Sequence, residues 1–498
     1  MDDVSAPLLL HPLVRWLGRR CLRWFYRERC VLGRDNIPAI GPVLLIGNHP
    51  NDLPDILLGY LSTSRPVRYV GTISGAASPI ARATYRGLGV IPVTRIRDAR
   101  KQRELGVNAA NNDAAFRSVS TALKAGAMVA VFPEGGVTDE PFMGPFRGGV
   151  SKMALDCAES GAKTAIRFVP IGLHYDAPRT PRTDTTVVIG ASFDLDDWLH
   201  TYHNSSSLSS AAAPSAAHRA QTLVAIALRN RMREALLTVT RNAATWEQAQ
   251  ARDRLAALIG ALNSSSDTSP LASAAQEQHA CAHFLRHPTV DAPTGDEKAT
   301  VRVTDNPMDA ARDNVIRMAN ALSAAVIRAG GRPESPRDCA RVLHATGVLS
   351  VSPNWPPSFV TLLSAPIALF GLALHAPVLA FVWRHAQHIA ADRAELVGKA
   401  FAPGLYFVFL WYAVLGLAFA TTLYVTAASA WWAAPAVMLL PRLGDVAVWW
   451  HDALSAWRLR ARVTRWSDAD RAEVRAAADA LHKAWATERT RARPGGDR

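Results

Sequence analysis

The chain has 498 residues, a formal net charge of +13 at pH 7 and 49% hydrophobic residues, so it has room for two or more domains and favours anionic partners. The anionic candidates are phospholipid headgroups, nucleic acid and an acidic carrier protein. Nucleic acid is the weakest candidate, because the aromatic residues gather in apolar runs instead of alternating with basic ones. The scattered cysteines form no C-x-x-C pair, which predicts a reducing compartment and no disulfide framework; they are Cys21, Cys30, Cys157, Cys281 and Cys339.

The first predicted element is an amphipathic helix between residues 13 and 29, within a segment that we assign to residues 1–35. Its apolar face comprises Leu13, Val14, Trp16, Leu17, Cys21, Trp24 and Phe25, and its basic face Arg15, Arg19, Arg23 and Arg27. This pattern is typical of a helix that lies in an anionic membrane surface. The alternative is a helix packed on the following domain with its arginines in water, and the two are compatible.

Residues 36–200 alternate strand-like and helix-like segments, which predicts an α/β domain with a mostly parallel sheet flanked by helices. Within it, the continuous apolar run 43–46 predicts a buried parallel strand that ends just before His49. A helix is expected to start near Asp52 or Leu53, because Asp is a good N-cap and the proline that follows is tolerated in a first turn.

Asp55 would lie in the first turn of that helix. From there its carboxylate can orient one imidazole nitrogen of His49 and leave the other nitrogen to take a proton from a hydroxyl group. On this segment alone, the alternative is that Asp52 caps the helix and His49 fills a turn.

Three further motifs follow the histidine block. In chain order the four blocks read Asn48-His49 to Asp55, Gly89-Val90-Ile91-Pro92-Val93-Thr94-Arg95, Phe132-Pro133-Glu134-Gly135 and Val169-Pro170-Ile171-Gly172. They resemble the glycerolipid acyltransferase superfamily (the phospholipid/glycerol acyltransferase, or lysophosphatidate acyltransferase-like, domain). Its blocks are N-H-x-x-x-x-D, G-x-I-P-V-x-R, F-P-E-G and a V-P-I/V run. The resemblance covers roughly residues 30–200.

Two departures from the family pattern bear on the acceptor. Five residues separate His49 from Asp55 instead of the commoner four, so the orienting carboxylate is Asp55 or Asp52. We favour Asp55, because the H-P-N-x-L-x-D form is similar to a branch that acylates glycerol 3-phosphate or dihydroxyacetone phosphate. The third block, from Phe132 to Pro141, lacks the arginine of lysophosphatidate enzymes and is similar to the F-P-E-G-x-S-x-D-x-P form of the same branch.

The resemblance implies direct transfer, with His49 as the general base that deprotonates the acceptor hydroxyl for attack on an acyl thioester. A phosphate-bearing acceptor needs fixed cations and backbone N–H groups. The candidate binding residues are Arg95 as the leading phosphate ligand, Arg97, Arg147 and Lys152 as helpers, Gly135 as a source of close backbone amides, and Glu134 as a partner of an acceptor hydroxyl or of Arg95.

The expected co-substrate is acyl-coenzyme A or acyl carrier protein, with no other cofactor. A hydrolase would need a nucleophile elbow such as G-x-S-x-G after a strand, and none is evident. His, Cys and carboxylate clusters at metal-ligand spacing are also absent from the sequence, so no metal is expected.

The rest of the chain divides into three predicted segments. Residues 201–355 have alanine-rich helical stretches between serine tracts, which indicates a helical insertion with flexible linkers. Residues 356–445 contain uncharged apolar runs, including 359–383, long enough to span a bilayer. A second helix is expected from Leu405 to about Thr426, followed by a short re-entrant or interfacial piece around Trp431-Trp432. Residues 446–498 predict a basic, solvated tail helix.

Charge on the flanks predicts the topology of the apolar region. Arginines precede the first span and follow the last one, so both flanks favour the cytoplasm and an even number of crossings is expected. The catalytic domain would then face the cytoplasm, from the inner membrane if the source is bacterial.

Three functions fit the sequence. The first is acylation of glycerol 3-phosphate or dihydroxyacetone phosphate by a membrane-bound enzyme of phospholipid biosynthesis. The second is acylation of a 1-acylglycerol 3-phosphate or another lysophospholipid with the same catalytic residues. The third is a non-catalytic lipid-binding protein of the same fold, which the intact His49, Asp55, Arg95 and Glu134 disfavour.

Overall fold

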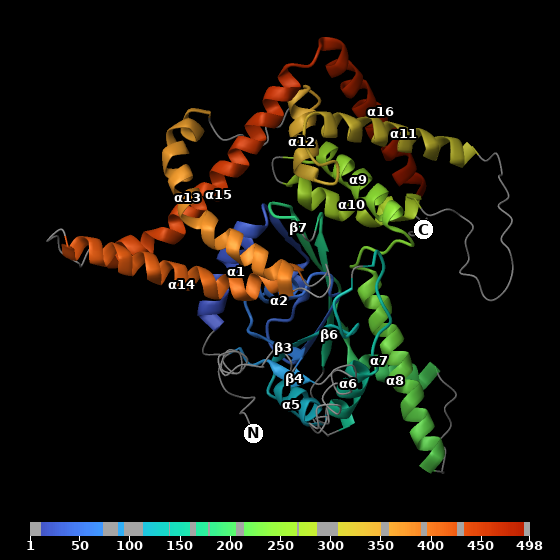
Figure 1. The fold of residues 1–498 in the computed structure, drawn as a ribbon. Helices are drawn as coiled ribbons and strands as arrows, with labels where there is room; N and C mark the ends of the chain where they lie inside the picture. The colour runs from blue at the N-terminus through green and yellow to red at the C-terminus, as the bar shows by residue number, and fades with distance from the viewer. Residues whose placement is uncertain are drawn as a thin grey trace. The chain divides into compact units, whose positions relative to one another are not determined.

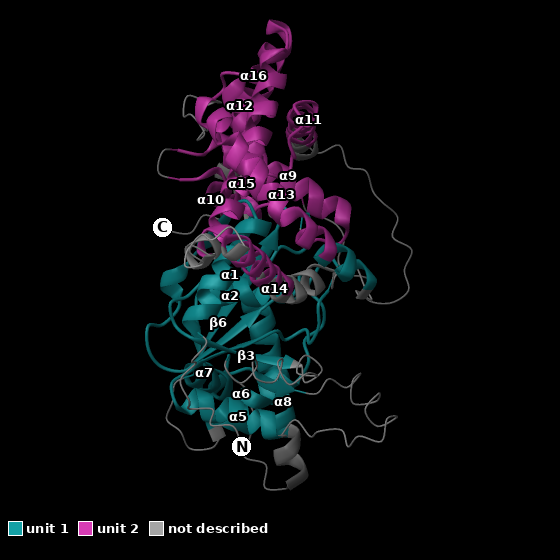
Figure 2. Ribbon diagram, turned by 60° about the vertical axis from the view of Figure 1, so that its left-hand side comes forward, with its two compact units in different colours: residues 1–181, 185–242, 382–405 teal, residues 182–184, 243–381, 406–498 magenta. Residues whose placement is uncertain are grey.

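The computed structural model describes residues 11–72, 88–93, 113–138, 140–159, 166–177, 180–205, 214–265, 268–285, 307–349, 358–389, 396–425 and 433–492. The chain separates into two compact units (Figure 2). The first contains residues 1–181, 185–242 and 382–405, and the second contains residues 182–184, 243–381 and 406–498.

The first unit is built on an eight-stranded sheet in the order β1-β7-β6-β2-β5-β3-β4, with β8 paired to β6 (Figure 1). Its strands are β1 (Arg29–Leu32), β2 (Val43–Gly47), β3 (Val67–Thr72), β4 (Ile91–Val93), β5 (Met128–Val131), β6 (Arg167–Tyr175), β7 (Thr185–Ile189) and β8 (Phe193–Asp194). β6 runs antiparallel to β7 and β8, and the other pairings among the described strands are parallel. The mostly parallel sheet predicted from the sequence is confirmed.

The central strand β2 is buried on both faces. Leu44 and Ile46 enter a core with α5 (Asp113–Lys124), α6 (Gly149–Glu159) and α8 (Pro214–Leu237), while Val43 and Leu45 enter a second core that includes Leu22 and Leu58. This alternation follows from the two-residue period of a strand, and it explains why the run is apolar throughout. α7 (Leu195–Ser205) follows β8.

Two helices cover the second face of the sheet, α1 (His11–Phe25) and α2 (Leu53–Leu61). Gly18 and Leu22 of α1 are buried, and a Cβ at Gly18 would lie 3.2 Å from Cδ2 of Leu57 on α2. Arg15 does not point into water as the sequence pattern suggested. Its guanidinium donates to the carbonyl oxygens of Tyr60 and Thr63, which are left open at the end of α2. Trp16 remains about half exposed.

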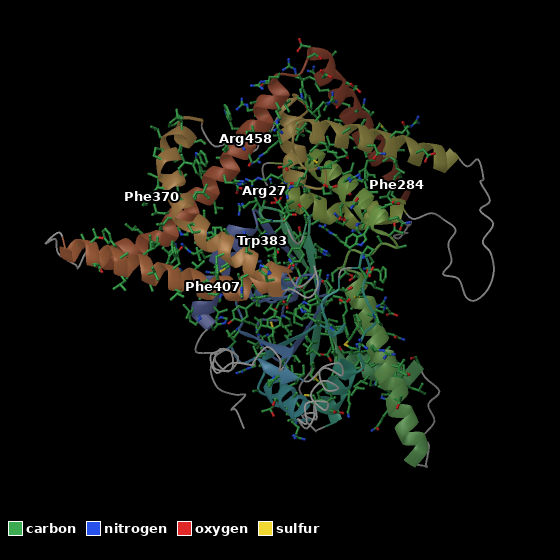
Figure 3. All side chains as sticks on the ribbon, viewed as in Figure 1. Arg27, Phe284, Phe370, Trp383, Phe407 and Arg458 are labelled. Carbon is green, nitrogen blue, oxygen red and sulfur yellow. The ribbon has the colours of Figure 1, made fainter. Side chains whose placement is uncertain are left out.

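The second unit has a helical bundle with its own hydrophobic core. The core joins α9 (Trp246–Leu262), α10 (Pro270–Leu285), α11 (Pro307–Arg328), α12 (Pro336–Ala345), the end of α15 (Ala433–Thr464) and α16 (Asp468–Ala492). Phe284 of α10, labelled in Figure 3, meets Trp485 of α16 edge to face, with ring centroids 5.5 Å apart.

This bundle differs from the segments expected from the sequence. The expected insertion 201–355 and the expected tail 446–498 contribute helices to one core, and α15 runs across the expected boundary at 445. α16 is not solvated on all sides, because Val474, Ala478, Leu481 and Trp485 are buried. These positions share one helix face.

The apolar region forms α13 (Ser358–Ile389), α14 (Leu396–Val425) and the first part of α15. Within the second unit, buried His375 of α13 hydrogen-bonds the carbonyl of Gly371 (2.7 Å) and the hydroxyl of Tyr412 on α14 (2.8 Å). Trp450 of α15 donates to the carbonyl of Thr361 at 3.0 Å. α13 therefore contacts both neighbouring helices. The expected re-entrant piece at Trp431-Trp432 lies outside the described residues.

Candidate active site

The histidine block leaves the sheet at the carboxyl end of β2. The side chain of Asn48 donates to the carbonyl of Leu173 on β6 (3.0 Å) and accepts from its N–H (2.7 Å), which fixes the end of β2 against β6. The imidazole of His49 then stacks on the ring of Phe132, with centroids 4.0 Å apart and planes 4° from parallel. Only 6% of His49 is exposed, so its ring is held in one orientation by packing.

Asp55 is the carboxylate that contacts His49. It is fully buried in the first turn of α2, and its Oδ2 lies 2.8 Å from Nδ1 of His49. Oδ2 also accepts from the backbone N–H of Asn51 at 2.6 Å, and Oδ1 accepts from the hydroxyl of Tyr175. Three donors therefore offset the cost of burying this charge. Within the described residues Nε2 of His49 makes no hydrogen bond.

The extra residue of the first block is accommodated at Asp52. Its backbone adopts φ 50° and ψ −123°, a conformation that L residues rarely take. The chain therefore reverses sharply between β2 and α2, and Asp55 reaches back to the imidazole.

The side chain of Glu134 contacts the backbone of His49. Its Oε1 accepts from the N–H of His49 (3.3 Å) and its Oε2 from the N–H of Gly144 (2.8 Å). Burial raises the pKa of Glu134, and these two hydrogen bonds oppose that rise. The sequence predicted a contact of Glu134 with an acceptor hydroxyl or with Arg95; because Arg95 lies outside the described residues, this stays a prediction. Both oxygens of Glu134 accept from backbone N–H groups, so this carboxylate links the backbone of His49 to that of Gly144.

Gly135 and Arg147 come together in the third block. Gly135 has φ +74°, and a Cβ there would lie 3.0 Å from Cγ of Arg147. The N–H of Arg147 donates to the carbonyl of Pro133 at 2.8 Å, and its side chain is exposed. Lys152, also exposed, lies in the first turns of α6 with its Nζ 5.9 Å from the ring centroid of Phe116. Arg95 and Arg97 follow β4 and lie outside the described residues.

Sequence reasoning missed several residues that shape the site. Tyr175, Asn51 and Phe132 surround the His49–Asp55 pair. Asn242 and Arg233 hold the loop that supplies Gly144: the Asn242 side chain accepts from the N–H of Met143 (2.8 Å), and Arg233 donates to the carbonyl of Gly144 (2.9 Å). Tyr175 had a readable signal, because it ends the strand of the fourth block, which lies beside β2.

A comparison with protein families decides which class of domain this is. Residues 28–174 match the family model described as Acyltransferase. The chain carries an acyltransferase-family domain. The match includes every residue of the candidate site in β2, α2 and the third block, and it ends one residue before Tyr175.

Curated relatives match short stretches of the chain. Glycerol-3-phosphate O-acyltransferase 1 of Saccharomyces cerevisiae is 31% identical over 77 residues, which are 15% of this chain and 10% of that protein. Glycerol-3-phosphate O-acyltransferase 2 of the same yeast is 38% identical over 65 residues, 13% of this chain and 9% of that protein. The chain thus spans about a tenth of the length of these relatives.

One solved structure matches part of the chain. It is the crystal structure of the 1-acyl-sn-glycerophosphate (LPA) acyltransferase PlsC from Thermotoga maritima, with a TM-score of 0.30 and 16% sequence identity. The alignment covers 45% of this chain and 79% of that one.

Proposed function

We propose that this protein transfers a fatty acyl group from an acyl thioester to a hydroxyl of glycerol 3-phosphate or dihydroxyacetone phosphate. The observation that carries the proposal is the buried contact between His49 and Asp55 at the carboxyl end of β2, inside the acyltransferase domain. A carboxylate on Nδ1 fixes the imidazole tautomer and supports the imidazolium, so Nε2 is the nitrogen that accepts a proton.

The proposed reaction needs no covalent enzyme intermediate. The acceptor O–H loses its proton to Nε2 of His49 while its oxygen attacks the thioester carbonyl. The tetrahedral intermediate then collapses, the C–S bond breaks, and the thiolate leaves with the proton that His49 returns. The backbone N–H groups of the turn at Gly135 and Gly136 are our candidates for donors to the oxyanion.

Two observations support a phosphate-bearing acceptor, and the second of them favours glycerol 3-phosphate over a lysolipid. Exposed Arg147 and Lys152 follow the third block, and a planar guanidinium suits a phosphate. The two yeast relatives carry glycerol 3-phosphate in their names. Arg95 and Arg97 complete the proposed phosphate-binding set.

We also propose that the protein is held in a membrane. One helix among the described residues is long and apolar enough to cross a bilayer, Phe359–His388, and Leu410–Leu423 is a shorter apolar stretch. Soluble core helices can pass the same test, but they are mostly buried, whereas 28% of this helix's apolar window is buried. Phe370, labelled in Figure 3, is 60% exposed. A lipid environment accounts for such exposure.

The deciding experiment is an acyl-transfer assay on detergent-solubilised protein. Glycerol 3-phosphate, dihydroxyacetone phosphate and 1-acylglycerol 3-phosphate are offered separately, first with a long-chain acyl-coenzyme A and then with acyl carrier protein as the donor. We expect product from a small phosphate acceptor and a loss of at least about 100-fold in kcat in His49→Ala. The matched control is His203→Ala, which removes an exposed imidazole from α7.

Product from 1-acylglycerol 3-phosphate alone would reassign the acceptor to a lysophospholipid. No product from any acceptor with either donor would leave a non-catalytic lipid-binding protein as the better interpretation.

A further inference from the structure

Tyr175 occupies a special place beside the His49–Asp55 pair. It is the last residue of β6, the strand parallel to β2, and its side chain is buried. Its hydroxyl donates to Oδ1 of Asp55, while His49 and Asn51 share Oδ2. Within the described residues, Tyr175 makes the one hydrogen bond to Oδ1.

We propose that Tyr175 is a positioning residue for the general base: its hydroxyl holds one oxygen of Asp55 so that the other stays aimed at Nδ1 of His49. This inference rests on the proposed acyl transfer, in which His49 is the base. A carboxylate held at a single oxygen can rotate about its terminal torsion, which is broad. A second anchor at Oδ1 removes that freedom.

The chemistry of the phenol suits this task. Burial, followed by the charge of Asp55, raises the pKa of Tyr175, so its hydroxyl stays protonated and remains a donor. The phenol is carried on a rigid ring at the end of a strand, and a hydrogen bond to a charged acceptor is stronger than one to a neutral acceptor. Tyr175 is therefore able to hold the carboxylate without competing for a proton.

A second tyrosine reaches the pair indirectly. Tyr26, fully buried just after α1, accepts from the side-chain amide of Asn51 at 2.7 Å, and its ring lies 5.5 Å from that of Tyr175. Its link to Asp55 passes through Asn51. Loss of the Tyr26 hydroxyl should consequently affect the pair less than loss of the Tyr175 hydroxyl.

The titratable groups around Asp55 come from every element packed on it. They are His49 after β2, Tyr26 after α1, Tyr69 on β3, Glu134 after β5 and Tyr175 on β6. Tyr69 is near enough for the charge of Asp55 to raise its pKa, and no hydrogen bond joins its hydroxyl to Asp55. Tyr69→Phe is thus a matched control that deletes a buried phenol near the same carboxylate.

The test compares Tyr175→Phe, Tyr26→Phe and Tyr69→Phe in the acyl-transfer assay over a range of pH. In Tyr175→Phe we expect kcat to fall about tenfold with KM changed less than about twofold. The acid limb of the kcat/KM profile should move to lower pH, because a carboxylate that can rotate away from Nδ1 stabilises the imidazolium less. Tyr69→Phe should leave the acid limb in place, and Tyr26→Phe should shift it less.

A second readout does not require turnover. Carbethoxylation of His49 by diethyl pyrocarbonate, followed by peptide mass spectrometry as a function of pH, reports the midpoint of its protonation directly. The midpoint should move downward in Tyr175→Phe and stay in place in Tyr69→Phe. An unchanged midpoint in folded Tyr175→Phe would overturn the positioning role, whereas absence of acyl transfer in the unsubstituted protein would count against the proposed function alone.

A double-mutant cycle separates the effect of Tyr175→Phe on His49 from any effect on folding. In an Asp55→Asn background, Tyr175→Phe should have no further effect on the rate of His49 carbethoxylation, because its action passes through the carboxylate. If Tyr175→Phe changed that rate equally in both backgrounds, the residue would serve packing alone and the proposal would be wrong.

Discussion

At the residue scale, Glu134 holds the backbone of the proposed base, His49. Both of its oxygens accept from N–H groups, one on His49 and one on Gly144. Glu134→Gln replaces one acceptor by an NH₂ group that would face an N–H donor. We expect a loss of about 1–3 kcal/mol in the free energy of unfolding, since one buried donor is left unsatisfied. Chemical denaturation with circular dichroism measures it.

The same substitution predicts a pH dependence. Burial raises the pKa of Glu134 above 4.5, so its contribution to stability is full below about that pH and is lost as pH rises through the higher, folded-state value. The glutamine side chain of the variant is not ionisable. The stability gap between the unsubstituted protein and Glu134→Gln should therefore narrow as pH rises from about 4 to about 8. If the difference in the free energy of unfolding instead widened over this pH range, burial could not be raising the pKa of the Glu134 carboxyl group.

Single residues also mark the limit of what the sequence could predict. The pairing of His49 with Asp55 was predictable, because the two residues are close in the chain and a strand followed by a helix brings them together. The hydrogen bonds that Glu134 accepts from the N–H groups of His49 and Gly144 were not predictable. They depend on Gly144 lying in a loop that Asn242 and Arg233 hold, and these side chains come from nearly 100 residues further along.

At the element scale, α2 carries Asp55 and must lie close to the sheet. Gly59 permits this approach, because a Cβ there would meet the hydroxyl oxygen of Tyr69 on β3 at 2.3 Å. Gly59→Ala should displace α2, lower the free energy of unfolding by about 1–3 kcal/mol and reduce kcat. Thermal unfolding and the acyl-transfer assay measure these two effects.

The obstructing atom can be removed independently. The double variant Gly59→Ala/Tyr69→Phe should recover most of the lost stability, because the new methyl group then replaces the hydroxyl oxygen. If the double variant did not recover stability, the loss in the free energy of unfolding caused by Gly59→Ala would come from the backbone of α2 and not from the hydroxyl of Tyr69.

Elements were predictable where the sequence pattern was local. The apolar run 43–46, for example, became β2. The bundle was not anticipated, because α16 shows a largely polar and alanine-rich sequence in which the buried face consists of Val474, Ala478, Leu481 and Trp485. Such a face indicates a partner but does not reveal which helices supply it.

At the scale of the whole molecule, the bundle of the second unit constrains the proposed membrane topology. Its core takes α9 to α12 from before the apolar region and α16 from after it. Arg328 of α11 also pairs with Asp470 of α16 at 3.2 Å. Segments that share one hydrophobic core lie on the same side of any membrane, so the chain between them must cross an even number of times. This agrees with the expectation from the basic flanks.

Cysteine labelling tests this conclusion in sealed membrane vesicles, in a background whose five native cysteines are replaced. Cysteines are introduced singly at Ile327 on α11, Trp457 on α15 and Phe370 on α13, all three of which are exposed. We expect an impermeant maleimide to label the first two from the same side and to leave Phe370→Cys unlabelled within the bilayer. Denaturing detergent should make all three reactive, which controls for expression. Labelling of Ile327→Cys and Trp457→Cys from opposite sides would be incompatible with a shared core, while labelling of Phe370→Cys from the aqueous phase would place α13 on the surface of a soluble protein.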